Sequence, residues 1–300
     1  MLSASGTYQD DTARFLSDLQ NGEPVSLLAA PAVVSHFDDY RRLFGYLQSL
    51  GVGSFHNVLL RADITLWAYD KLLRQQPHAG LIASPCAALS AYIRQRLPVL
   101  LPFLMPVHSP LLCSMIYLRK YKQVSGRLAF LSPCVAKRAE MCLAGQPGYN
   151  VTIGRLKQHL AAAGVDLTNY PPVDFSDRGE GGGRTLGAYG GLCEAVAPHL
   201  PDGEFVKRSG PGIYPWLKDY ARSVKSGHKL PTLLELYNCC GGCDNGPGTG
   251  RRQAHAGAAA LKKPGVTPDP QLTMNLFARF DRELCLDDFL CQPEWQQNKM

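Results

Sequence analysis

Charged residues are sparse in this sequence, and no long run of one charge sign occurs. They make up 19% of the 300 residues, and the formal net charge is only +6. The basic residues stand in scattered pairs such as Arg41-Arg42 and Lys262-Lys263, and no zinc-finger or RNP-like motif is present. Nucleic acid is therefore not an expected partner. A hydrophobic content of 45% together with this low charge is typical of a globular chain and excludes a disordered one.

Uninterrupted hydrophobic segments are also missing. The longest apolar region, residues 97–118, contains four prolines at intervals of four: Pro98, Pro102, Pro106 and Pro110. Because proline breaks a helix, this region is not expected to insert into a membrane. The first residues, MLSASGTYQDD, lack the basic and apolar stretches of a secretion signal. We therefore expect a cytoplasmic protein.

Cysteine, by contrast, is plentiful. The ten cysteines are Cys86, Cys113, Cys134, Cys142, Cys193, Cys239, Cys240, Cys243, Cys285 and Cys291. Disulfides rarely persist in the cytoplasm. Clustered cysteines in such a chain indicate metal binding or redox chemistry.

Two similar strand–helix units stand out in the first half of the chain. An apolar run at 81–84 is followed by Pro85-Cys86 and a helical pattern, and a run at 128–131 is followed by Ser132-Pro133-Cys134 and a short helix through Lys137. In open α/β sheets, ligands bind at the carboxyl ends of strands, and a helix N-terminus lowers the pKa of a thiol. Both cysteines are placed as metal ligands would be. The equally weighted alternative is that each cysteine is a small buried hydrophobic residue without a ligand role.

The segment 239–248 carries the densest cysteine pattern. Three cysteines fall within five residues, separated by glycines, directly after an apolar strand at 232–237. Glycine lets the backbone wrap closely around an inorganic core. Three interpretations remain open from the spacing: a zinc site, a redox Cys-x2-Cys pair, and an iron–sulfur cluster. The cluster would use four thiolates, Cys86, Cys134, Cys239 and Cys243. The ferredoxin run C-x2-C-x2-C-x3-C is absent.

Three stretches of the sequence resemble, in order, the cluster-binding signatures of the iron-only ([FeFe]) hydrogenase catalytic domain. Residues 83–87, ASPCA, resemble Thr-Ser-Cys-Cys-Pro. Residues 132–140, SPCVAKRAE, resemble Met-Pro-Cys-x-x-Lys-x-x-Glu, and residues 235–243, ELYNCCGGC, resemble Glu-x-Met-x-Cys-x-x-Gly-Cys. Weaker matches between them are Ala30-Pro31-Ala32, His108-Ser109-Pro110 and residues 187–191, GAYGG. The resemblance spans about residues 25–250.

The resemblance implies a fold and a domain organisation. We expect an α/β protein with two lobes, each a small mixed or parallel sheet flanked by helices, and the cluster site between the lobes. The polar residues 1–24 are themselves expected to form an N-terminal arm or a first helix. The domain would cover residues 25–293, with lobe one at about 25–145 and lobe two at about 146–293.

The resemblance also implies the cofactors and the residues that hold them. In this family the H-cluster joins a [4Fe–4S] cubane to a two-iron subcluster carrying CO and CN⁻ ligands. Cys86, Cys134, Cys239 and Cys243 would be the metal ligands of the cubane, and Cys243 would bridge to the two-iron subcluster. Lys137 would donate a hydrogen bond to one cyanide; its alternative role is a solvated surface lysine. Cofactor-binding contacts would also come from Ala30, Pro31, Ala32, Ser109 and Pro110. Glu140 and Glu235 would be supporting partners or ordinary salt-bridge residues, and the other six cysteines packing residues.

The implied activity is reversible H₂ oxidation and proton reduction, with H₂ and protons as substrates and a ferredoxin-like electron partner. Active hydrogenases carry a proton-relaying cysteine before the first ligand, where this chain has Pro85, and methionines where it has Ser132 and Tyr237. Accessory ferredoxin modules are not found within these residues. These departures are similar to those of the sensory members of the family, which implies low activity, or sensing of H₂ or redox state with a signalling partner. Two rivals remain: a [4Fe–4S] redox or assembly protein without the two-iron subcluster, and a structural zinc protein.

Overall fold

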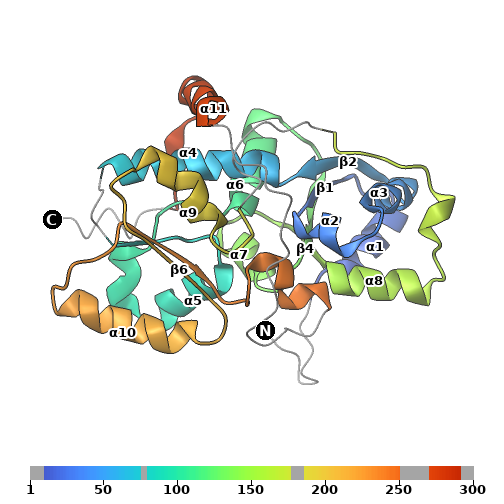
Figure 1. Cartoon of the computed structure of the whole chain (residues 1–300). Helices are drawn as coiled ribbons and strands as arrows, with labels where there is room; N and C mark the ends of the chain where they lie inside the picture. The colour runs from blue at the N-terminus through green and yellow to red at the C-terminus, as the bar shows by residue number, and fades with distance from the viewer. Residues whose placement is uncertain (1–9, 76–79, 177–185, 251–269, 292–300) are drawn as a thin grey trace. The chain divides into compact units, whose positions relative to one another are not determined.

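The contacts within the chain divide it into two compact units (Figure 1). The computed structural model describes residues 10–75, 80–176, 186–250 and 270–291. Unit 1 comprises residues 1–60, 114–179 and 243–253, and unit 2 comprises residues 61–113, 180–242 and 254–300. Residues 1–9 of the expected arm and 292–293 of the expected domain lie outside the described residues.

Unit 1 is built on a parallel sheet with the strand order β2-β1-β4-β5. Its strands are β1 (Val25–Ala29), β2 (Val52–Asn57), β4 (Arg127–Ser132) and β5 (Gly148–Thr152). Every residue of β1 is buried, which is typical of a central strand in a parallel sheet that is covered on both faces. The lobe boundary expected near residue 145 falls between β4 and β5, which pair from Leu128–Gly148 to Ser132–Thr152.

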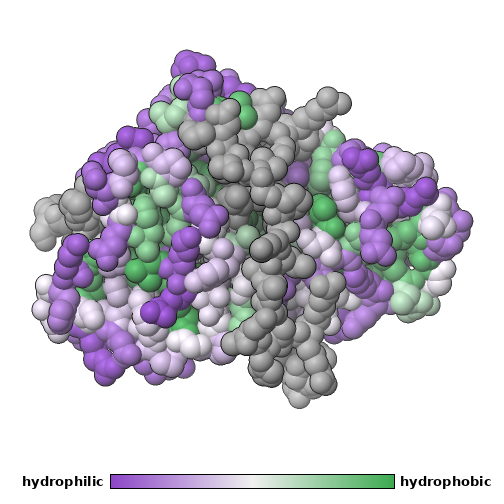
Figure 2. Space-filling view, in the orientation of Figure 1, coloured by the Kyte–Doolittle hydropathy of each residue, from purple (hydrophilic) through white to green (hydrophobic). Residues whose placement is uncertain are grey.

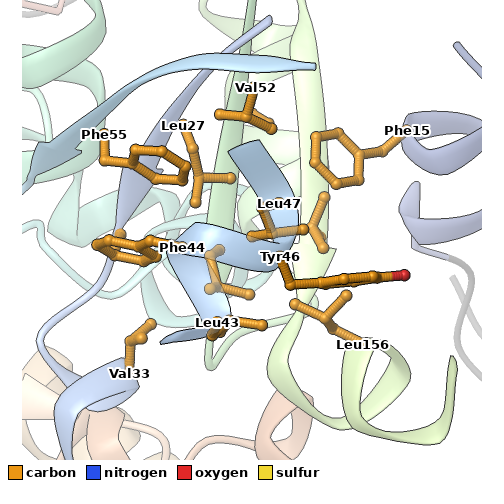
Figure 3. Packing of buried hydrophobic residues seen from close by; sticks show 14 of the residues in the cluster. Phe15, Leu27, Val33, Leu43, Phe44, Tyr46, Leu47, Val52, Phe55 and Leu156 are labelled. Carbon is orange, nitrogen blue, oxygen red and sulfur yellow. The ribbon is translucent and has the colours of Figure 1, made fainter. Parts of the chain in front are cut away.

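Four helices of unit 1 bury apolar side chains in one cluster with the sheet (Figure 3). These helices are α1 (Thr12–Gln20), α2 (Ala32–His36), α3 (Tyr40–Ser49) and α8 (Ile153–Ala162). A fifth helix, α7 (Lys137–Leu143), buries Lys137 and Met141. Phe44 of α3 stacks on Phe55 of β2 with 4.5 Å between ring centroids. Of the two expectations for residues 1–24, an arm or a first helix, residues 12–20 form the helix, because Phe15, Leu16 and Leu19 share one buried face.

Unit 2 holds a smaller parallel sheet with the order β3-β7-β6. Its strands are β3 (Leu81–Ile82), β6 (Phe205–Ser209) and β7 (Leu233–Tyr237), and its helices include α5 (Ala87–Arg96), α9 (Gly191–Val196), α10 (Ile213–Lys225) and α11 (Pro270–Glu283). α10 buries Ile213, Leu217 and Tyr220 and exposes a charged face, which appears as hydrophilic surface in Figure 2. The prediction of an α/β fold with two small sheets is confirmed, and all the strand pairs named here are parallel.

Two further helices and several short helical turns complete the described structure. Two helices, α4 (Leu59–Gln75) and α6 (Pro110–Ile116), contain two of the points where the chain passes from one unit to the other. The short helical turns are η1 (Pro98–Phe103), η2 (Tyr117–Tyr121), η3 (Leu167–Asn169), η5 (Ala197–His199), η6 (Cys243–Asn245), η7 (Pro247–Thr249) and η8 (Leu286–Phe289). Within the described ranges, no helix combines the length and the apolar character that a membrane crossing needs.

Candidate metal centre

Cys134 sits in a tight turn at the carboxyl end of β4 in unit 1. The Ser132 hydroxyl oxygen accepts a hydrogen bond from the Cys134 backbone N–H and donates one to the Cys134 carbonyl, both at 3.0 Å. The side-chain amide of Asn150, fully buried on β5, donates to the same carbonyl at 3.0 Å. Three hydrogen bonds therefore fix the backbone that carries this half-buried thiol.

Lys137, the first residue of α7, is a buried cation. Its side chain keeps 10% of its surface exposed, and its Nζ donates to Glu140 Oε2 at 2.7 Å. Burial, the largest single influence, lowers the pKa of the ammonium group. The Glu140 carboxylate, with smaller contributions from Cys134 and Cys243, more than offsets burial, and the pKa of Lys137 ends above its ordinary value. The group stays charged at neutral pH, and the alternative of a solvated surface lysine is wrong.

Cys243 comes close to the same lysine because two glycines pack against the Cys134 turn. A Cβ on Gly248 would lie 2.7 Å from the Pro133 carbonyl carbon and 2.8 Å from the Cys134 nitrogen; a Cβ on Gly246 would lie 2.3 Å from the Pro133 oxygen. These distances leave no room for a side chain. The glycines thus bring Cys134, Lys137 and Cys243 together within unit 1.

A histidine that the sequence analysis did not identify connects α2, which follows the loop at 30–32, to the loop that carries Cys243. His36, buried in α2, has its Nε2 2.9 Å from the carbonyl oxygen of Asp244. Ala30, at the end of β1, donates its N–H to Leu131 O at 3.0 Å, so that N–H belongs to the sheet. Pro31 precedes α2 and Ala32 begins it.

Cys86 and Cys239 follow two neighbouring strands of unit 2. β3 pairs with β7 in parallel, Ile82 opposite Leu234, so both strands end at the same edge of the sheet. Cys86 caps the N-terminus of α5 and is half-buried, and Cys239 is 8% exposed. Burial raises the pKa of the Tyr214 phenol, and the sulfurs of Cys86 and Cys239 raise it further, which places both thiols near this one tyrosine.

Glu235 clamps the loop at 187–191 to β7. Its side chain is fully buried and accepts hydrogen bonds from the N–H of Gly190 at 3.1 Å and of Cys193 at 2.8 Å. Burial raises the pKa of this carboxyl group. Gly242, with φ +100°, lies so close to the loop that a Cβ would be 2.6 Å from Gly187 O. Glu235 is therefore a supporting residue for the cysteine loop, not a surface salt-bridge residue.

Ser109 and Pro110 open α6 from the side of unit 2. The Ser109 oxygen accepts a hydrogen bond from Leu112 N at 3.5 Å, and Pro110 occupies the first helical position, which proline favours. Ser109 is 2% exposed. Their contact with a cofactor stays a prediction.

The remaining cysteines differ in their surroundings. Cys113 and Cys193 are buried, as expected of packing residues, and Cys240 and Cys291 are half-buried. Cys142 and Cys285 are exposed, so they are not packing residues. Among the described residues, no group of three or more His, Cys, Asp or Glu side chains is arranged to hold one metal ion. Each cysteine of a cubane binds a different iron, so a cubane does not need such a group.

Comparison with known proteins gives one family match. A family described as "Iron only hydrogenase large subunit, C-terminal domain" matches residues 23–208, more than half of the chain. The matched range includes Cys86, Cys134 and Lys137 and ends before Cys239 and Cys243. None of the curated proteins compared matches the sequence.

Solved structures with a similar fold include several [FeFe]-hydrogenases. One, concerned with oxygen inactivation through modification and degradation of the H cluster 2Fe subcluster, is 17% identical with a TM-score of 0.63, covering 97% of this chain and 92% of that chain. A glutamate variant of HydA1 from Chlamydomonas reinhardtii is 16% identical with a TM-score of 0.63 and the same coverage. An apo cysteine variant of that hydrogenase is 17% identical with a TM-score of 0.62, covering 93% and 90%. At these identities the likeness establishes a shared fold.

Proposed function

Since the chain belongs to the family of the iron-only hydrogenase large subunit, C-terminal domain, we propose that it binds a [4Fe–4S] cubane through Cys86, Cys134, Cys239 and Cys243. The donor set fits such a cluster, because soft thiolates are the ligands that iron–sulfur clusters require. The observation that carries the proposal is the buried, charged Lys137 beside two of these thiols. A buried cation stabilises thiolates over thiols.

The remaining residues would serve the two-iron subcluster. Cys243 would bridge the two parts of the H-cluster, and Lys137 would donate a hydrogen bond to a cyanide ligand. The turn Ala30-Pro31-Ala32 and the Ser109-Pro110 helix start would line the subcluster. When bound, the H-cluster supplies reversible cleavage of H₂ into two protons and two electrons.

The chain's own residues favour low turnover or a sensory role. Pro85 occupies the position of the proton-relaying cysteine and has no proton to transfer. Proton delivery along that route would therefore be slow. Slow turnover would suit a protein that reports H₂ or redox state to a signalling partner. A ferredoxin-like protein would be its electron donor or acceptor. A reducing compartment, the cytoplasm, suits its thiolate ligands.

A second candidate is a redox or assembly protein that keeps the cubane and lacks the two-iron subcluster. Two substitutions favour it. Ser132 and Tyr237 stand where the family has methionines; the Ser132 hydroxyl is engaged by Cys134, and Tyr237 is 2% exposed.

Anaerobic reconstitution tests both candidates. The full chain would be supplied with iron and sulfide, and about four irons and four acid-labile sulfides per chain would support the cubane. A content of about one zinc without iron or sulfide would support the structural zinc protein instead. Infrared bands of CO and CN⁻ after exposure to the hydrogenase maturation enzymes would support the H-cluster. Their absence from protein with an intact cubane would leave the second candidate.

A further inference from the structure

The residue before Cys239 is an asparagine whose amide lies against the sulfur. Asn238 Nδ2 donates to Cys239 Sγ at 3.8 Å, within the range of hydrogen bonds to sulfur. At its other end, the Asn238 Oδ1 accepts a 2.5 Å hydrogen bond from the hydroxyl of Tyr214. All three residues belong to unit 2.

Tyr214 decides which end of the amide faces the sulfur. Its hydroxyl is the donor of the 2.5 Å hydrogen bond to the amide. The amide oxygen is the end that accepts this hydrogen bond, and the NH₂ group is left to face Cys239. A metal-bound thiolate is an acceptor, so the selected orientation is the favourable one.

The tyrosine is itself held in place. It lies on α10, whose apolar face packs in one cluster with residues of α5 and β7. Its ring contacts Tyr92 of α5 edge to face, with 4.6 Å between centroids. Because Cys86 is the N-cap residue of α5, the same packing positions Cys86 and the amide beside Cys239. The hydrogen-bond chain is therefore partly buried and lies against the packed apolar cluster of the unit.

We propose that Asn238, oriented by Tyr214, is a positioning residue that raises the reduction potential of the cluster by donating an N–H···S hydrogen bond to Cys239. The inference rests on the proposed function, since it needs Cys239 to be a cluster ligand. Reduction adds one electron from the external electron donor and no proton. The added negative charge spreads onto the cysteine sulfurs, so a hydrogen bond to sulfur stabilises the reduced cluster more than the oxidised one. The side chain touches a ligand, and it takes no part in H₂ chemistry.

The test is an anaerobic redox titration of the reconstituted full chain, followed by the electron paramagnetic resonance signal of the reduced cluster. Asn238→Ala removes the donor, and Asn238→Asp keeps the shape but replaces the NH₂ group by an oxygen. Tyr214→Phe keeps Asn238 and removes the hydroxyl that orients it. Asn169→Ala, on the short turn η3 of unit 1, and Tyr40→Phe, whose hydroxyl contacts Asp174, are the matched controls.

We expect Asn238→Ala to make the midpoint potential more negative, with a change of up to about tenfold in the one-electron reduction equilibrium, equivalent to about 59 mV. The shift should be larger for Asn238→Asp, smaller for Tyr214→Phe and absent in the controls, all at unchanged iron content. If the Asn238 variants lose the cluster, the midpoint potential of Tyr214→Phe still tests the inference. Potentials equal to that of the unaltered chain in every variant that holds a cluster would overturn the inference. Absence of a cluster from the unaltered chain would instead refute the proposed function.

Discussion

The backbone N–H of Gly248 donates a 2.8 Å hydrogen bond to the carbonyl of Pro133. This contact joins two stretches that are far apart in the sequence, the turn that carries Cys134 and the loop that carries Cys243. The absence of a side chain at residue 248 permits the approach, since a Cβ there would meet three backbone atoms at 2.7 to 2.8 Å. The distance between two proposed ligands, Cys134 and Cys243, thus depends on a residue that is not itself a proposed ligand.

Gly248→Ala is expected to disturb this spacing. The backbone of Pro133 and Cys134 must move, which should lower the free energy of unfolding by about 1–3 kcal/mol and reduce iron incorporation. Urea unfolding and iron content after reconstitution measure both effects. Gly212→Ala is the matched control, because a Cβ at Gly212 meets nothing within 4 Å and its φ is −68°. Equal iron content in Gly248→Ala and the unaltered chain would contradict the expectation.

The features of the candidate metal centre that depend on neighbouring residues could be predicted from the sequence. Cys86 and Cys134 were identifiable because each follows an apolar strand and precedes a helical pattern, and these are features of neighbouring residues. Lys137 was identified by its spacing from Cys134. Its burial against Glu140 was not predictable from spacing, because an (i, i+3) pair of this kind is as common on exposed helix surfaces.

The non-local part could not be predicted. Ser132 was noted as a lost methionine, while in the folded chain its hydroxyl holds the Cys134 turn. The clamp of Glu235 on the N–H groups of Gly190 and Cys193 depends on tertiary packing that leaves no local pattern. The expected lobes, about 25–145 and 146–293, follow each other in the sequence. Strands from the two ranges nevertheless pair, as when β3 pairs with β7 across a long crossover.

Removal of a single proposed ligand should abolish cluster binding. Cys134→Ala and Cys239→Ala each take away one of four thiolates, and both should lose the iron, the sulfide and the broad visible absorption of the cluster. Cys285→Ala removes an exposed cysteine and should leave all three unchanged. Full iron content and visible absorption in Cys239→Ala would show that the ligand assignment is wrong.

The buried pair of Lys137 and Glu140 should be costly to break. Lys137→Met leaves the carboxylate of Glu140, 14% exposed, without its cation, and stability should fall by about 3 kcal/mol. Lys137→Met combined with Glu140→Leu should recover most of the loss, because no buried charge is left behind. Urea unfolding of the single and double variants, all without iron, gives the free energies of unfolding from which the interaction between the two side chains is obtained. Additive losses in the double variant would mean that the two side chains do not interact.

Acid should weaken unit 2 through His108. Burial lowers the pKa of this imidazole, and the nearby Arg94 lowers it further; its Nδ1 lies 3.5 Å from Cys291 Sγ, and its carbonyl accepts from Cys113 Sγ. The unfolded chain binds a proton at this histidine near pH 6.5, whereas the folded chain binds it at lower pH. Stability therefore rises with pH across this range and is lost as the pH falls through about 6.5.

The His108 contribution can be isolated by substitution. His108→Gln should flatten the change in unfolding free energy between about pH 7.5 and pH 5.5, where each pKa unit of difference between the two states corresponds to about 1.4 kcal/mol. His228→Gln, which removes an exposed histidine, is the control. The same pH slope in His108→Gln as in the unaltered chain would exclude this histidine as the source.

Pro85→Cys should raise H₂ turnover in protein that carries the two-iron subcluster. The substitution places a thiol directly before Cys86, where active members of the family have their proton relay, and general acid–base catalysis typically contributes about 10² or more. Ala88→Cys adds a thiol within α5 at a position that does not precede a ligand, and it should leave turnover unchanged. Turnover is measured as H₂ release with a chemical reductant, after infrared bands have verified the subcluster in each variant. If Pro85→Cys and Ala88→Cys then release H₂ at the same rate as the unaltered chain, proton delivery at residue 85 does not limit the reaction.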